Sequence, residues 1–193
     1  MKAKVKYRKY GNIPDMNTVK DIIVYGAKQG KAKKQYAFKD MNGNYCEKTF
    51  DEVFYDATGL GQHLYTLGLK GKKVAILSEN SYYWIAAFYS IASGNMIAIP
   101  LDPKLPEEDL VDLMVRSGCD AIYYTQDFAP AIQMMKENPE VKLSVYLKFE
   151  DFDELVRMGH EELNGGAKNY LNDEVKPDDL VFIVYTSGTT GKS

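Results

Sequence analysis

From Lys73 onward, the sequence alternates short apolar runs with longer amphipathic stretches. The apolar runs show no regular polar alternation and predict buried strands at 74–77, 95–100, 120–125, 143–147 and 180–185. The stretches between these runs predict helices over about 82–93, from 106, near 129–136 and over 152–163. Strands of this kind, separated by helices, are typical of a parallel sheet that is covered on both faces. The sequence therefore predicts an α/β fold with a doubly wound, mostly parallel sheet flanked by helices.

A β-hairpin is predicted at 33–50, before the sheet begins. Asn42-Gly43 stands between the two strands and suits a tight two-residue turn, in which both central residues take positive φ. Thr49 and Glu52 have the spacing of a capping box, which predicts a helix that begins near Asp51. The apolar stripe of this helix consists of Val53, Ala57, Leu60, Leu64 and Leu67.

The charges are unevenly distributed. Residues 1–39 carry 11 Lys/Arg and 2 Asp/Glu, a net charge of +9, whereas the other 154 residues carry 13 and 25, a net charge of −12. A basic arm on an acidic body can bind nucleic acid or an anionic surface, or it can be a solvated leader that complements the charge of the body. No nucleic-acid-binding motif accompanies it, so we favour the solvated leader and expect no nucleic-acid partner. We assign residues 1–32 to this leader and a first helix.

Composition excludes several classes of protein. Cys46 and Cys119 belong to no CxxC or Cys/His cluster, so we expect reduced thiols rather than a disulfide framework or a zinc site. No apolar run approaches the ~20 residues that span a bilayer. The basic start at Met1 leads into no apolar stretch and is not a secretory signal. We expect a cytoplasmic protein without a transmembrane segment.

Three further features each have two interpretations. The helix at 82–93 is apolar nearly all round. We favour the interpretation that it is buried against neighbouring elements, and contact with a membrane surface or a partner remains the alternative. His63 and His160 stand in no catalytic or metal-binding pattern and are interpreted as surface or helix-face residues. The run Glu107-Glu108-Asp109 is interpreted as favourable negative charge in the first turn of a helix rather than as a metal cluster.

The segment after Tyr185 carries the most specific chemical signal. It is rich in glycine and hydroxyl residues, so its backbone can turn sharply and its N–H and O–H groups can surround phosphate oxygens. A loop at the carboxyl end of a parallel strand is also where ligands of open α/β sheets bind. The P-loop pattern is rejected, because Thr186 stands where that pattern requires glycine. The candidate phosphate-binding residues are Thr186, Ser187, Gly188, Thr189, Thr190, Gly191 and Lys192.

Tyr185-Thr-Ser-Gly-Thr-Thr-Gly191 resembles the phosphate-binding signature of the adenylate-forming enzymes, which include acyl-CoA synthetases, luciferases and the adenylation domains of peptide synthetases. The resemblance runs from about residue 18 to the end. Gly191-Lys192-Ser193 is most similar to the long-chain fatty acyl-CoA synthetase branch. Supporting segments, in the order and spacing of the family, are Thr49–Glu52, Leu67–Leu69, Lys73–Ser81 with Trp84, Ile97–Pro103 with Leu105–Glu108, and Asp178-Asp-Leu180.

The resemblance implies that the parent protein uses ATP with Mg²⁺ to convert a carboxylic acid, a fatty acid, to an acyl-adenylate and pyrophosphate. Coenzyme A would then form the thioester. It also implies that 33–193 is the N-terminal α/β subdomain of a larger enzyme, truncated within the phosphate-binding loop. The motif lysine of the family would be residue 194, so its role is not assigned to Lys192. The catalytic residues, the metal ligand and the acyl pocket would lie beyond Ser193.

Two alternatives accompany this prediction. The chain by itself, lacking those parts, is expected to be inactive, and it can instead be a non-catalytic folding or interaction module that self-associates through an exposed sheet edge. The acid can also be an amino or aryl acid rather than a fatty acid. The acyl chain length, the thiol acceptor and the oligomeric state are not encoded in these residues.

Overall fold

A four-stranded parallel sheet forms the centre of the protein in the computed structural model, which describes residues 14–185. The strands are β3 (Lys73–Leu77), β4 (Ile97–Pro100), β5 (Ala121–Tyr124) and β6 (Val145–Lys148). Their order is β4-β3-β5-β6, and all three neighbouring pairs are parallel. These strands lie where the apolar runs predict them, and the doubly wound α/β fold class is confirmed.

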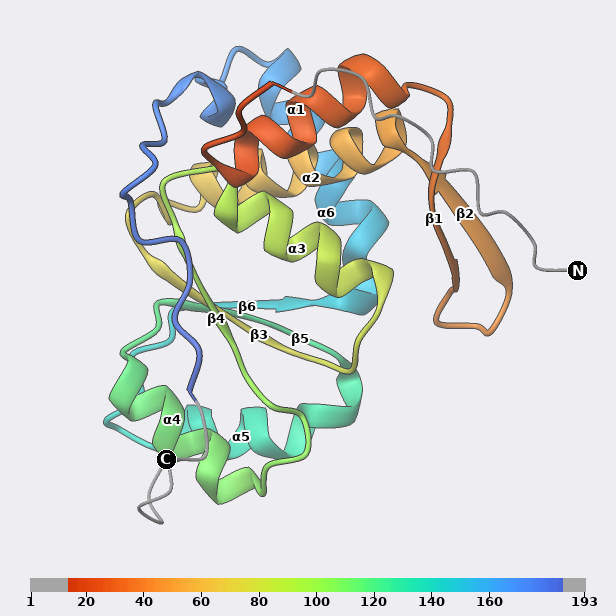
Figure 1. The fold of residues 1–193 in the computed structure, drawn as a ribbon. Coiled ribbons are helices and arrows are strands. Elements are labelled where there is room, and N and C mark those ends of the chain that lie inside the picture. The colour runs from red at the N-terminus through yellow and green to blue at the C-terminus, as the bar shows by residue number, and fades with distance from the viewer. Residues whose placement is uncertain (1–13, 186–193) are drawn as a thin grey trace, which may run out of the picture.

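Helices cover both faces of the sheet (Figure 1). On one face lie α1 (Val19–Gly30), α2 (Phe50–Thr66), α3 (Tyr82–Ala92) and α6 (Phe152–Asn164), and on the other lie α4 (Glu107–Ser117) and α5 (Ala129–Glu137). Val74 and Ile76 of β3 point into the first layer, while Ala75 and Leu77 point into the second. We call these two apolar cores the α3-side cluster and the α4-side cluster. Both sides of β3 are buried, which explains its lack of polar alternation. Three short 3₁₀ turns, Gln126–Phe128, Phe149–Asp151 and Tyr170–Asn172, complete the elements.

The hairpin consists of β1 (Lys34–Lys39) and β2 (Tyr45–Thr49), which pair in antiparallel fashion. The predicted two-residue turn at Asn42-Gly43 is wrong. Gly43 has a φ of 82°, but Lys31 is the only non-glycine residue with positive φ in the described structure, so Asn42 does not adopt the required conformation. Instead, the carboxylate of Asp40 accepts hydrogen bonds from the backbone N–H of Asn42 at 2.9 Å and of Asn44 at 2.8 Å. This side chain organises a longer loop.

Helix α2 begins as the capping box predicts. The hydroxyl of Thr49 accepts from the backbone N–H of Glu52, and the Glu52 carboxylate accepts from the backbone N–H of Thr49 at 2.7 Å. The helix crosses α6 at two glycines, because a Cβ on Gly159 would lie only 1.8 Å from the carbonyl oxygen of Gly59. The two backbones therefore approach more closely than side chains would permit.

The two histidines bridge this α2–α6 interface. The His63 ring is buried, and its Nδ1 lies 2.8 Å from Oε1 of Glu162. The His160 ring stacks on Tyr55 at 3.7 Å between centroids, and its Nε2 lies 2.9 Å from the Tyr55 carbonyl oxygen. His63 is thus a buried helix-face residue rather than a surface residue. Both rings serve the packing of one helix against the other.

The segment 180–185 does not form the predicted strand. It makes one isolated parallel bridge, between Phe182 and Ala98 of β4. The backbone N–H of Ala98 donates to the carbonyl of Val181 at 2.8 Å, and that of Ile183 donates to the carbonyl of Ala98 at 3.0 Å. The ladder does not continue, because the next residue of β4 on this side is Pro100, which has no N–H to donate. The segment lies at the edge of the sheet, and its residues alternate between exposed and half-buried. Leu180, Phe182 and Val184 are more than half exposed.

Candidate functional site

The predicted phosphate-binding residues, Thr186 to Lys192, lie outside the described residues, as does the start of the basic leader. The structure does describe the segment that leads to them. Phe182 packs toward the ring of Phe88 on α3, with 6.1 Å between centroids. Ile183 and Tyr185 pack against the α4-side cluster. The segment therefore contacts both layers of the fold although it forms a single bridge with β4.

The last described residue of that segment lies against α4. The Arg116 guanidinium carbon stands 5.8 Å from the centroid of the Tyr185 ring, within the range of a cation–π contact. Arg116 also pairs with Asp112, one turn earlier in the helix, at 3.0 Å. The predicted first turn of this helix is confirmed as well, since Glu107, Glu108 and Asp109 occupy it. Their negative charge there favours the helix through its dipole.

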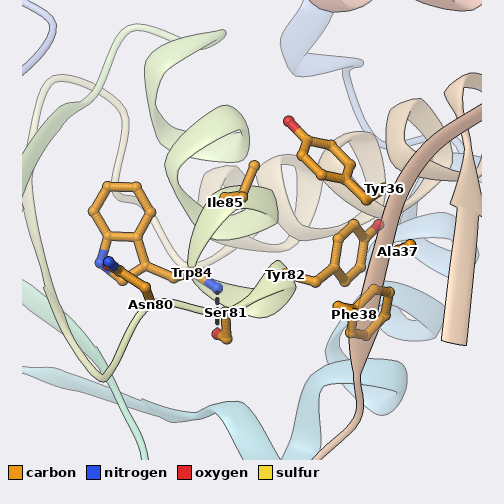
Figure 2. Close-up of a pocket in the computed structure, with 8 residues that line it drawn as sticks. All are labelled: Tyr36, Ala37, Phe38, Asn80, Ser81, Tyr82, Trp84 and Ile85. Atoms are coloured by element: carbon orange, nitrogen blue, oxygen red, sulfur yellow. Dashed lines mark hydrogen bonds between the residues drawn. The ribbon is translucent and has the colours of Figure 1, made fainter. Parts of the chain in front are cut away.

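A pocket of about 420 Å³ opens between the hairpin and the start of α3, at the carboxyl end of β3 (Figure 2). Trp84 and Asn80 lie on one side of the first turn of α3, and Tyr36 and Phe38 of β1 lie on the other. Ser81 begins the helix, and its Oγ accepts a hydrogen bond from the Trp84 N–H at 3.2 Å. The lining residues are Tyr36, Ala37, Phe38, Asn80, Ser81, Tyr82, Trp84 and Ile85, and none of them carries a charge.

Aromatic stacking and a buried ion pair hold the hairpin wall of this pocket. Phe38 stacks on Tyr82 with 4.6 Å between centroids. The buried carboxylate of Asp56 on α2 accepts from the Lys48 ammonium of β2 at 2.7 Å and from the hydroxyl of Tyr82. Burial, and then the negative charge of Asp56, raise the pKa of Tyr82, so its hydroxyl stays protonated as a donor. The network thus ties β2, α2 and α3 together.

A second tyrosine contact closes the same wall. The hydroxyls of Tyr36 and Tyr89 lie 3.1 Å apart. Burial, followed by this hydrogen bond, raises the pKa of Tyr36, so this ring is neutral as well. The pocket is therefore an uncharged, aromatic-walled space that suits apolar or aromatic groups and offers no cation to a phosphate.

A smaller hollow of about 280 Å³ lies nearby, between the hairpin loop and the start of α6. Its lining includes the carboxylates of Asp40, Glu150 and Asp153 beside the ring of Tyr83. Negative charge of this density repels phosphate oxygens. Neither of these two hollows, as the described residues line them, is thus suited to a triphosphate.

Within residues 14–185, no three His, Cys, Asp or Glu side chains gather closely enough to hold a metal ion. No helix in the same range is long and apolar enough to cross a membrane. Cys46 and Cys119 are free thiols, the second one buried.

Sequence reasoning missed the Asp56 network. A signal for it was present, because Asp56 shares a helix face with Val53, Ala57 and Leu60, where an apolar residue is expected. A charged residue on an apolar stripe needs a buried partner of opposite charge. Its cationic partner, Lys48, is eight positions away on a strand of the hairpin, and its second donor, Tyr82, is 26 positions away in another helix. Neither contact could be read from the sequence, because both depend on how separate elements pack.

Comparison with known proteins extends these observations to the segment after Tyr185. The family described as AMP-binding enzyme matches residues 27–193. The long-chain-fatty-acid–CoA ligase FadD13 of Mycobacterium tuberculosis is 31% identical over 129 residues, which cover 66% of this chain and 25% of that protein. The nonribosomal peptide synthetase tcpP of Claviceps purpurea is 31% identical over 119 residues, covering 61% of this chain and 5% of that protein.

The fold has a matching solved structure. The N-terminal domain of FACL13 from Mycobacterium tuberculosis superimposes with a TM-score of 0.76 at 24% identity, covering 91% of this chain and 42% of that one. The chain thus spans about a quarter of the length of its CoA-ligase relative and much less of the peptide synthetase. With a family match that includes the segment Thr186–Gly191, the chain belongs to the AMP-binding enzymes, the adenylate-forming ligases.

Proposed function

We propose that the full-length protein to which this chain belongs activates a fatty acid with ATP and transfers it to coenzyme A. The observation that carries this proposal is the family match over 27–193, which contains the candidate phosphate-binding residues Thr186 to Lys192. The similarity to FadD13 supports a fatty acid as the substrate and coenzyme A as the acceptor. The alternative is an amino or aryl acid as the substrate, and the similarity to a peptide synthetase supports the amino acid.

The proposed reaction has two steps. A carboxylate oxygen of the acid attacks the α-phosphorus of ATP, and the bond from that phosphorus to the bridging oxygen breaks, so that pyrophosphate leaves with the electron pair. The sulfur of coenzyme A, after losing its proton, then attacks the acyl carbonyl carbon, and AMP leaves. In-line displacement at phosphorus requires alignment of the reactants and neutralisation of charge more than covalent help from the protein.

In this scheme, the residues from Thr186 to Lys192 bind the β- and γ-phosphates. Their backbone N–H groups and hydroxyls donate hydrogen bonds to oxygens whose charge grows as pyrophosphate leaves, and the Lys192 ammonium adds a positive charge. Magnesium bound with ATP would share the negative charge of these phosphates, and no described residue is assigned to it. The remaining catalytic groups and the acyl pocket belong to the part of the relatives that the chain does not span, so the chain alone is proposed to be inactive.

A second candidate function for the chain alone is self-association. Leu180, Phe182 and Val184 are 58, 51 and 53% exposed along the edge beside β4. Apolar side chains at a sheet edge favour pairing with another strand. Under this alternative, replacing Phe182 by lysine converts an oligomer of the chain to a monomer in light-scattering measurements, while a monomeric wild-type chain refutes it.

The reaction is tested by ATP–pyrophosphate exchange with the full-length gene product, over a panel of fatty, aryl and amino acids, with the 193-residue chain assayed in parallel. We expect exchange that depends on fatty acids and that is absent for the chain alone. Exchange only with aryl or amino acids would correct the substrate class. A folded protein that binds ATP but exchanges with no acid would refute the catalytic proposal.

Variants of the loop refine this test. Gly188→Val and Thr189→Val are expected to abolish exchange while the far-UV circular dichroism spectrum and the unfolding midpoint stay unchanged, since they remove backbone freedom and a hydroxyl donor from the phosphates. Ser193→Ala is the matched control, because residue 193 is not among the candidate phosphate-binding residues. Wild-type exchange in both valine variants would remove this segment from the mechanism.

A further inference from the structure

Arg116 connects helix α4 to the segment that precedes the candidate phosphate-binding residues. Its guanidinium carbon lies 5.8 Å from the centroid of the Tyr185 ring. Its Nε pairs with Oδ2 of Asp112 at 3.0 Å, so the carboxylate restricts the orientation of the guanidinium plane. The Arg116 side chain is 39% exposed, which leaves its charge only partly screened by water. A cation at this distance from a tyrosine ring is attracted to the ring face.

The position of Tyr185 gives this contact its significance. Tyr185 immediately precedes Thr186, the first candidate phosphate-binding residue. The nearest backbone anchor behind it is the hydrogen bond from the N–H of Ile183 to the carbonyl of Ala98, at 3.0 Å. Beyond that bond, Ile183 and Tyr185 are held by side-chain packing against the α4-side cluster, to which α4 contributes Leu110, Val111, Leu113 and Met114.

A glycine-rich segment has high backbone freedom, so the point from which it starts must be fixed by residues that precede it. Binding of phosphates by backbone N–H groups requires those groups to be oriented before the ligand arrives, or affinity is lost to ordering. The ring of Tyr185, which contacts both the α4-side cluster and the Arg116 guanidinium, is suited to fix that starting point.

We propose that Arg116 is a positioning residue for the nucleotide: it holds the Tyr185 ring against α4 and thereby fixes where the phosphate-binding segment begins. This inference rests on the proposed function for its ligand, but the contact itself can be tested without nucleotide. The contacts described for Arg116 are those with Tyr185 and Asp112. The effect of Arg116 on ATP is exerted through Tyr185.

The test compares four forms of the 193-residue chain: wild type, Arg116→Ala, Arg116→Lys and Arg157→Ala. Arg157 is a matched control, since it is an exposed helical arginine of α6 that also pairs with a neighbouring carboxylate, that of Glu154. The first readout is hydrogen exchange of the backbone amides of 181–185 without nucleotide. The second is the dissociation constant for ATP with magnesium, by calorimetry.

For Arg116→Ala we expect faster hydrogen exchange at the backbone amide of Ile183. We also expect the dissociation constant for ATP to rise about two- to five-fold, the range that a partly exposed cation–π contact supplies. Lysine retains the cation and is expected to restore most of both values, whereas Arg157→Ala is expected to match wild type. Unchanged exchange at Ile183 in Arg116→Ala would overturn the proposal. Faster exchange with unchanged ATP affinity would overturn it as well, because the anchor would then not position the nucleotide.

Failure of the proposed function gives a different pattern. If neither the wild-type chain nor the full-length product binds ATP, the proposed function is refuted, and the part of the inference that concerns the nucleotide is refuted with it. The exchange rates then decide separately whether Arg116 anchors the 180–185 segment. If only the full-length product binds ATP, the same four forms are compared in that product.

Discussion

Replacement of Gly159 by alanine has two opposing effects on the free energy of unfolding, one from helix propensity and one from packing. Alanine in a helix interior is about 1 kcal/mol more favourable than glycine, so propensity alone predicts a more stable protein. The structure predicts the opposite, because the added Cβ would lie 1.8 Å from the carbonyl oxygen of Gly59 and 2.6 Å from its carbonyl carbon. Neither neighbour can rotate away, since both are backbone atoms of α2.

The magnitude follows from these distances. An ordinary contact of a Cβ begins at about 3.4 Å, so the helices must separate by more than 1 Å at the crossing. Overpacking of this kind costs about 1–3 kcal/mol. Separation also stretches the hydrogen bond between His63 and Glu162, now 2.8 Å, whose loss adds about 1.5 kcal/mol for a charged partner. After the gain in propensity is subtracted, we expect a net destabilisation of about 2 kcal/mol.

Urea unfolding followed by circular dichroism measures this change, and the fluorescence of Trp84 supplies a second probe of the same transition. Gly165→Ala is the matched control. Gly165 has a φ of −76° at the end of α6, and a Cβ there meets its nearest atom at 3.3 Å. The control is expected to change stability by about 0.5 kcal/mol or less. A Gly159→Ala protein at least as stable as wild type would refute the packing argument.

Three further predictions concern stability. Asp56→Ala is expected to lower the unfolding free energy by about 2–3 kcal/mol, because it leaves Lys48 and a tyrosine hydroxyl without their acceptor. A double-mutant cycle with Lys48→Met measures the coupling energy of the Lys48–Asp56 pair, and zero coupling contradicts the prediction. Lys31→Gly is expected to raise the unfolding free energy by about 1 kcal/mol, since Lys31 has a φ of 45°, which strains the backbone of a residue with a side chain. An unchanged or lower urea midpoint for this variant would argue against such strain. Hydrogen bonds from two lysine ammonium groups hold the pKa of Asp173 well below its ordinary value. The contribution of the ionised Asp173 carboxylate to stability is therefore complete above about pH 4 and is lost as pH falls through the folded-state pKa. The difference in unfolding free energy between wild type and Asp173→Asn should shrink only in acid. A constant difference down to pH 2 refutes this prediction.

Much of the fold could be predicted from local patterns. The strand β3 is recognisable because both of its faces are buried, so that every residue in 74–77 is apolar. The start of α2 is recognisable because a capping box is a contact between residues only three positions apart. Both features are complete within a few neighbouring residues, and the surrounding structure has little opportunity to change them.

One part of the candidate site could be predicted from the sequence and another part could not. The segment Thr186–Gly191 is specific as a pattern of residue types, and its family was identified from that pattern. The pocket beside α3 was not predicted, since its walls come from Phe38 and Trp84, which lie 46 positions apart in the sequence (84 − 38). Nothing in either local stretch indicates that the two residues line one pocket from opposite sides of the first turn of α3 (Figure 2).

The sequence by itself determined the α/β class, the positions of the four strands of the sheet and the chemical character of the glycine-rich segment, because these depend on periodicity and on short-range hydrogen bonds. Tertiary structure decided the rest. It placed both histidines in one helix interface, gave Asp56 its cation and set Arg116 against Tyr185. It also left 180–185 with a single bridge. These outcomes depend on which distant surfaces meet, and burial of apolar area is a non-directional force that many local sequences satisfy equally well.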